Sequence, residues 1–148
     1  MTGISDEMVA SAPLFEEVAP QIFNLLEGRV FVAHNVSFDY SFVHYHLVRA
    51  GYKWEAPKLC TIKLSRKVFP GLVKYGLGSL TKDLGIKIEG RHRAWGDAQA
   101  TAEVLTMAIE KQGMNPIHYL LSKKEPYKKK APSNKISDDA HEVEPFDD

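Results

Sequence analysis

Residues 30–39 read VFVAHNVSFD and contain a transition from a strand to a helix. The first four residues form an unalternated apolar run, which is typical of a buried strand in a parallel sheet. His34 and Asn35 follow at the carboxyl end of this strand, where open α/β sheets place their ligands. The spacing of apolar side chains then predicts a helix over residues 37–50. A strand that leads directly into a helix indicates an α/β fold.

The segments on either side continue this alternation of helix and strand. Apolar side chains at helical spacing over residues 14–26 predict an amphipathic helix, and Gly28 is placed to end it. Residues 58–62 fit a second strand that leads into a basic helix, although the pattern there is ambiguous. Two further helices are expected over residues 79–84 and 97–111, each followed by a glycine.

The composition fits one globular domain followed by a charged tail. The chain has 148 residues, of which 44% are hydrophobic and 26% charged, enough for a single core. We expect the domain to occupy residues 1–113 and residues 114–148 to form a largely disordered tail, in which residues 117–121 could add one more turn of helix. Residues 123–148 hold six Lys and seven Asp or Glu together with three Pro, a mixture that buries little apolar surface.

The chain has one cysteine, Cys60, so an intrachain disulfide is excluded. It has neither an apolar leader at its start nor an uninterrupted apolar run of about 18 residues. These features predict a cytoplasmic protein without a membrane partner.

The net charge of zero conceals an uneven distribution. Residues 1–57 carry three Lys or Arg against seven Asp or Glu, whereas residues 58–93 carry nine against two. A basic middle segment suits a polyanion such as nucleic acid, although a solvated lysine-rich surface would give the same count. Lys63, Arg66 and Lys67 are the candidate substrate-binding residues of this segment.

Two motifs carry the chemical information. Residues 92–101 read HRAWGDAQAT, with a histidine, an alanine two residues on and an aspartate five residues on. Together with residues 34–39, HNVSFD, this stretch resembles the second and third motifs of the DEDD superfamily of 3′–5′ exonucleases. The resemblance is to the histidine branch, which includes the epsilon subunit of bacterial DNA polymerase III. Several shorter matches extend it from Met1 to about Lys111: TGI at 2–4, LCT at 59–61, SRK at 65–67 and LGI at 84–86.

The resemblance implies a ribonuclease H-like fold and a 3′–5′ exonuclease that acts in proofreading or repair. It makes His92 the general base, Asp97 a direct metal ligand and Asp39 a second metal-binding carboxylate. Two divalent ions, Mg²⁺ or Mn²⁺, are then the expected cofactors, because oxygen ligands suit these ions and paired metals catalyse phosphodiester hydrolysis. Taken singly, the two aspartates also fit ordinary helix starts and His92 an exposed loop histidine.

The same resemblance assigns the substrate site. His34 and Asn35 are expected to line it and Phe38 to pack beneath it. Thr101 is expected to steady Asp97 by a hydrogen bond. Trp95, where relatives usually have a smaller residue, fits either stacking on a base or packing against the last helix. The implied partners are nucleic acid, above all DNA 3′ ends, and a DNA polymerase or a further nuclease domain.

The sequence departs from the family at its beginning. Family members carry an Asp-x-Glu pair on their first strand, and nothing before His34 supplies one. Asp6 and Glu7 are expected in the loop before the first helix, so they are no substitute. We therefore expect a truncated exonuclease that lacks the first three strands, with weak metal binding and at most traces of cleavage. The strand over residues 30–33 would have an open apolar edge. The alternative is a non-catalytic nucleic-acid-binding or interaction module.

Overall fold

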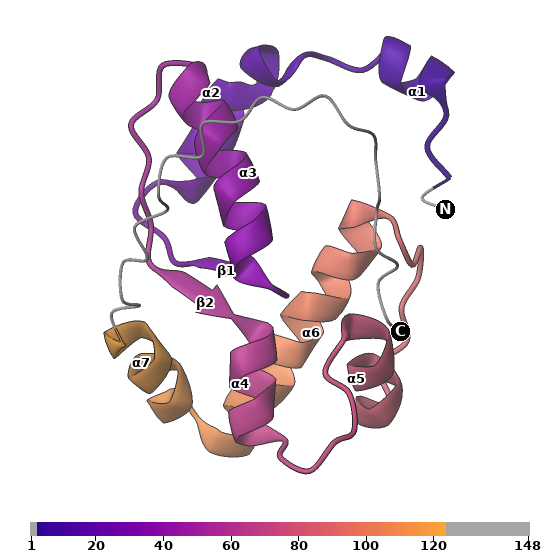
Figure 1. Ribbon diagram of the computed structural model, residues 1–148, viewed down its shortest axis with the longest axis vertical. Helices are drawn as coiled ribbons and strands as arrows, with labels where there is room; N and C mark the ends of the chain where they lie inside the picture. The colour runs from indigo at the N-terminus through magenta and orange to yellow at the C-terminus, as the bar shows by residue number, and fades with distance from the viewer. Residues whose placement is uncertain (1–2, 124–148) are drawn as a thin grey trace, which may run out of the picture.

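The computed structural model describes residues 3–123 (Figure 1). In chain order the elements are α1 (Asp6–Ala10), α2 (Phe15–Leu26), β1 (Phe31–Ala33), α3 (Val36–Arg49), β2 (Lys58–Cys60), α4 (Thr61–Val68), α5 (Leu77–Leu84), α6 (Ala94–Gln112) and α7 (Asn115–Ser122). No helix within the described range is long and apolar enough to cross a membrane.

The sheet consists, within the described range, of β1 and β2, and their pairing is parallel. Phe31 pairs with Lys58 and Ala33 with Cys60, and α3 makes the crossover that parallel strands require. This confirms the α/β fold and both predicted strands. β1 is half-buried, not buried as expected, and the preceding Val30 is 41% exposed. The reason is that β1 has a strand neighbour on one side among residues 3–123.

Helices form a layer on each side of the two strands (Figure 1). α2 and α3 enclose a cluster around Ala19, Leu47 and Trp54, whose ring meets that of Phe31 at 5.5 Å between centroids. On the other side α4, α6 and α7 enclose a second cluster, made of Leu59, Leu64, Val68, Phe69, Ala108 and Ile117. β2 contacts helices of both layers and so connects the two clusters.

The first helix was not predicted, since Asp6 and Glu7 were expected to lie in a loop. The structure has both in the first turn of α1, where acidic side chains suit the helix dipole. Ser5 caps this helix, because its hydroxyl accepts a hydrogen bond from the amide of Met8 at 3.3 Å. α1 buries none of its residues. The hydrogen bond to Ser5, and not apolar burial, therefore stabilises the start of this helix.

The folded part also extends beyond the expected domain boundary at residue 113. α7 follows directly and contacts α4 and β2, with Pro116 and Ile117 buried. Pro116 stands at the start of the helix, where its missing amide hydrogen costs nothing. The ordered domain therefore continues at least to Ser122. The remainder of the expected tail, residues 124–148, lies outside the described residues.

Candidate active site

The turn between β1 and α3 holds the first group of predicted residues. Asn35 adopts a left-handed conformation with φ 67° and ψ 58°, which asparagine tolerates better than most residues. Its carbonyl oxygen accepts a hydrogen bond from the amide of Phe38 at 3.2 Å and so starts the helix. The side chains of Asn35, Phe38 and Asp39 are all exposed at the carboxyl end of β1.

Phe38 does not lie where the sequence predicted it. Its ring is 69% exposed and does not pack beneath the site. No described element covers this part of α3, where Phe42 is exposed as well. An uncovered ring beside Asp39 leaves an aromatic surface available to a ligand.

His34 is held at both ring nitrogens by the protein itself. Nε2 lies 2.7 Å from the carbonyl oxygen of Tyr75, and Nδ1 lies 2.7 Å from the hydroxyl of Thr61. A carbonyl can only accept, so Nε2 carries the hydrogen and Nδ1 accepts from Thr61. Burial lowers the pKa of His34, against the opposing effect of the Tyr75 hydrogen bond. The ring therefore joins β1, α4 and the loop before α5, and it has no free nitrogen for a substrate.

Asp39 lies in the first turn of α3. Partial desolvation raises the pKa of Asp39, while a hydrogen bond with its own backbone amide acts in the opposite direction. The structure thus disfavours the charged form of this carboxyl group. A bound cation would favour the charged form, and the carboxylate oxygens of Asp39 are ligands of the kind that Mg²⁺ and Mn²⁺ prefer.

His92 lies at the tip of the turn before α6. Its φ of 66° makes it, with Asn35, one of the two non-glycine residues in the described range that have a left-handed backbone. The turn is closed by a hydrogen bond of 2.9 Å from the amide of Arg93 to the carbonyl of Gly90. The side chain is exposed. Residues with uncommon backbone conformations are often found in active sites and ligand-binding sites.

Neighbouring side chains hold this turn in place. The ring of Trp95 lies against Gly90, because a Cβ atom added there would be 2.7 Å from its Cζ2 atom. The guanidinium of Arg91 lies against Gly78 of α5, and Nη2 of Arg93 donates to the carbonyl of Gly3 at 2.8 Å. Trp95 is nevertheless 57% exposed. Its packing partner is thus the turn itself, and the rest of the indole faces solvent.

Asp97 lies one turn into α6, which begins at Ala94, three residues before the predicted start. Its Oδ1 atom is buried and has no hydrogen-bond partner. The hydroxyl of Thr101 donates at 2.8 Å to the main-chain oxygen of Asp97, so it does not bind the carboxylate as expected. Threonine in a helix often bonds back to the carbonyl four residues earlier, which explains the difference. A buried oxygen without a partner is unfavourable and suits a ligand that is absent from the protein alone.

The fit to a two-metal centre is incomplete. Over residues 3–123 no three His, Cys, Asp or Glu side chains come together in a way that could hold a metal ion. Asp97 and Asp39 have the right chemistry for Mg²⁺ or Mn²⁺, but two carboxylates leave most of an octahedral shell unfilled. These residues by themselves do not make the metal site that the sequence resemblance implies.

The three basic residues predicted to bind substrate lie on the exposed side of α4. Arg66 lies over the ring of Tyr75, 5.8 Å from its centroid, and Lys67 lies over the ring of Tyr119 at 4.1 Å. α4 begins at Thr61, the partner of His34, and leads away from it. The basic residues therefore follow the helix from the strand ends toward α7.

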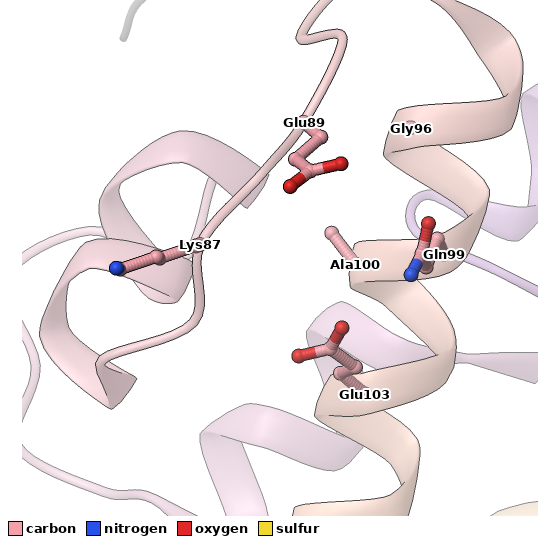
Figure 2. A pocket seen from close by; sticks show the side chains of 6 residues that line it. All are labelled: Lys87, Glu89, Gly96, Gln99, Ala100 and Glu103. Atoms are coloured by element: carbon pink, nitrogen blue, oxygen red, sulfur yellow. The ribbon is translucent and has the colours of Figure 1, made fainter.

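A hollow with a volume of about 260 Å³ lies beside the start of α6. Its lining residues are Lys87, Glu89, Gly96, Gln99, Ala100 and Glu103. Figure 2 shows the carboxylates of Glu89 and Glu103 pointing into the hollow and the ammonium of Lys87 pointing away. The sequence motifs did not indicate this hollow, although four of its residues share one helical face through their spacing. Asp97 does not line it.

Comparison with known proteins supports the resemblance that the two motifs indicate. The family model for exonucleases of the RNase T type matches residues 1–105. The 3′–5′ exonuclease DinG of Bacillus subtilis (strain 168) is 43% identical over 112 residues, covering 75% of this chain and 12% of that protein. The DNA polymerase III subunit epsilon of Aquifex aeolicus (strain VF5) is 40% identical over 111 residues, covering 74% of this chain and 55% of that protein.

A solved structure has the same fold. Exonuclease X, in complex with 5′ overhanging duplex DNA, superposes with a TM-score of 0.59 and 26% identity over 80% of this chain and 68% of that chain. The chain thus spans about half of the epsilon subunit and a small part of DinG. The predicted resemblance and the ribonuclease H-like α/β fold are confirmed.

Proposed function

The chain belongs to the exonuclease family of the RNase T type, and we propose that it supplies the general base and two acidic ligands of a 3′–5′ exonuclease site. The observation that carries the proposal is the arrangement at the start of α6. There a strained turn presents the exposed His92, and Asp97 keeps a buried oxygen without a partner. Both features cost stability and are explained if they serve catalysis.

Each residue then has a distinct role. His92 takes the proton of the attacking water, because imidazole is the side chain that exchanges protons near neutral pH. Asp97 and Asp39 are metal ligands, completed by carboxylates that residues 3–123 do not supply. Asn35 and the exposed ring of Phe38 contact the nucleotide, and His34 fixes the strand end beneath them. Divalent Mg²⁺ or Mn²⁺, when bound, would stabilise charge on the phosphate.

The proposed substrate is a nucleic acid with a free 3′ end, and DNA is favoured. The support comes from relatives whose names refer to DNA polymerase III and from a neighbour solved with duplex DNA. A polymerase is the proposed protein partner on the same ground. The basic side chains of α4 provide charge for a polyanionic strand.

The test adds metal ligands to those that residues 3–123 supply. A segment with three strands and an Asp-x-Glu pair, of the kind found in the exonucleases that the sequence resembles, is joined ahead of Met1. We expect this extended protein to digest 5′-labelled single-stranded DNA from its 3′ end with Mg²⁺ or Mn²⁺. The unextended chain should give at most traces of product. No digestion by a folded extended protein would overturn the proposal. Rapid digestion by the unextended chain would instead show that its own residues complete the metal ligands.

Substitutions in the extended protein separate the roles. His92→Ala should lower turnover by about 10² to 10⁴-fold, the usual effect of removing a general base. Asp97→Ala should abolish metal-supported activity, because it removes a ligand. His118→Ala and Glu110→Gln change an exposed histidine of α7 and an exposed acid near the end of α6, and should leave turnover unchanged.

The second candidate is a nucleic-acid-binding module without hydrolysis. It is favoured by one observation, the lack of a three-ligand metal group within the described residues. The same experiment decides between the two. Binding of 3′-ended strands by the extended protein with no cleavage in either metal would support the module.

A further inference from the structure

Two lysines converge on one aromatic ring where α4 and α7 meet. Nζ of Lys67 lies 4.1 Å from the centroid of the Tyr119 ring, and Nζ of Lys123 lies 4.5 Å from it. We call Lys67, Tyr119 and Lys123 the basic patch. Figure 1 shows α7 beside α4, and the two helices contact each other. A third lysine, Lys111 at the end of α6, lies over the ring of Phe69, with its Nζ 5.0 Å from the ring centroid.

The patch concentrates positive charge that its own helices do not balance. The two ammonium groups are separated by no more than the sum of their distances to the ring centroid. That separation is close to the Debye length of about 8 Å at physiological ionic strength, so salt screens their repulsion only in part. Neither α4 nor α7 contains an Asp or Glu. The aromatic ring attracts both cations but carries no charge to offset them.

The two lysines also change the acidity of the Tyr119 phenol. A hydrogen bond with Lys123, the charge of Lys123 and, to a smaller extent, the charge of Lys67 lower the pKa of the Tyr119 phenol. Tyr119 is 45% exposed and both lysines are exposed, so a ligand can reach the patch. A large anion with regularly spaced charges is the chemistry that such a surface fits.

The distance from the candidate active site determines which part of a strand could reach the patch. The end of α6 leads directly into α7, which carries Tyr119, so its distance from Asp97 approximates that of the patch. Asp97 near the beginning of α6 and Lys111 near its end are fourteen residues apart. At 1.5 Å per residue this is about 21 Å along the helix. Phosphates along one strand of B-form DNA are about 3.4 Å apart, so this length corresponds to at most about six nucleotides, and to fewer in a more extended single strand.

We propose that Lys67, Tyr119 and Lys123 form an anchoring site for backbone phosphates of the nucleic-acid substrate, up to about six nucleotides from the 3′ end. The proposal rests on the proposed function, which places the 3′ end at Asp39, His92 and Asp97. The anchor is separate from the residues that face the terminal nucleotide. The anchor recognises charge and not base sequence, because the phosphates are the same whatever the order of the bases.

The test compares a short and a long strand. Binding of 5′-fluorescein-labelled dT4 and dT12 is followed by fluorescence anisotropy with the full chain, without divalent metal. Replacing both lysines by alanine (Lys67→Ala with Lys123→Ala) should weaken dT12 binding about tenfold and leave dT4 binding unchanged. The slope of log affinity against log salt for dT12 should fall by about 1.4, or 0.7 for each lost phosphate contact on a single strand.

Matched variants identify the cause. Arg29→Ala with Lys53→Ala removes two exposed positive charges from the acid-rich part of the chain and should leave dT12 binding unchanged. Lys67→Arg with Lys123→Arg keeps the charge and should restore most of the affinity. Circular dichroism should show the same helix content in all variants. Equal weakening of dT4 and dT12, or no weakening of either, would overturn the anchor.

Two further measurements separate the anchor from its premise. A dT12 strand blocked at its 3′ end should bind more weakly than the free strand if the proposed active site holds the terminus. Equal binding of the two would count against the proposed function, while the effect of the lysine substitutions on dT12 would still test the anchor. If poly-glutamate displaces dT12 as well as unlabelled dT12 does, the patch binds acidic peptide and the anchor is overturned.

Discussion

Asp97 combines a helix-start position with a buried oxygen that lacks a hydrogen bond. An unpaired buried polar atom costs about 1–3 kcal/mol, and the favourable interaction of a carboxylate with the helix dipole returns only part of this. Asp97→Ala should therefore raise the free energy of unfolding by about 1 kcal/mol in the absence of metal. Urea denaturation of the two proteins measures the difference.

Glu103 provides the matched control, since it is an exposed acid on the same helix. Glu103→Ala should change the free energy of unfolding by less than about 0.5 kcal/mol. A clear loss of stability in Asp97→Ala would mean that the carboxylate is satisfied in the free protein, and it would remove the main support for a ligand at this position.

The buried position of His34 predicts a pH dependence of stability. Because the pKa of His34 is lowered in the folded protein, the unfolded chain takes up this proton first as the pH falls through about 6.5. The free energy of unfolding should therefore decrease as the pH falls from about 7.5, and this contribution should level off below the folded pKa. Chemical denaturation at a series of pH values gives the slope.

Two substitutions test whether His34 causes this pH dependence. His34→Asn removes the titrating group and should flatten the pH dependence between about pH 7 and 6. His118→Asn alters an exposed histidine on α7 and should keep the slope of the natural chain. If both variants retain it, another group is responsible for the pH dependence.

At the scale of elements, α7 lies beyond the domain boundary at residue 113 that the sequence predicted. Ile117 is 5% exposed and packs in the cluster with Val68 and Phe69. Ile117→Ala should lower the free energy of unfolding by about 2–4 kcal/mol, as for other large-to-small changes in a core. Leu25→Ala, at a site that is 63% exposed, should cost less than about 0.5 kcal/mol. Equal urea midpoints for the two variants would show that the domain ends before α7.

The elements that the sequence predicted well are those with long or repeated patterns. Apolar spacing identified α2, α3, α5 and α6, and glycines marked the ends of α5 and α6. α1 was missed because five residues give too little periodicity, and its start depends on one serine cap. α7 was underestimated because the charged sequence after it drew the expected boundary back to residue 113. Its burial comes from α4 and β2, which are distant in sequence.

At the scale of the whole molecule, the motifs predicted which residues matter but not how they are held. The resemblance to the exonuclease motifs singled out His92 and Asp97, and their site roles stay predictions. Three contacts that shape the site join residues far apart in the chain: His34 with Thr61, His34 with Tyr75, and Arg93 with Gly3. Such contacts leave no local pattern, so neither the neutral bridge at His34 nor the unpaired oxygen of Asp97 could be read from the sequence.

The bond from Arg93 to the carbonyl of Gly3 has a practical consequence for purification. It spans 90 positions of the chain and brings Gly3 to the residue next to His92. An affinity tag fused ahead of Gly3 would begin next to that turn. A run of tag histidines there would present imidazoles and chelating groups next to the candidate general base and would obscure both metal titrations and activity assays. A tag for this protein therefore belongs at the other terminus, or behind a protease site that removes it before measurement.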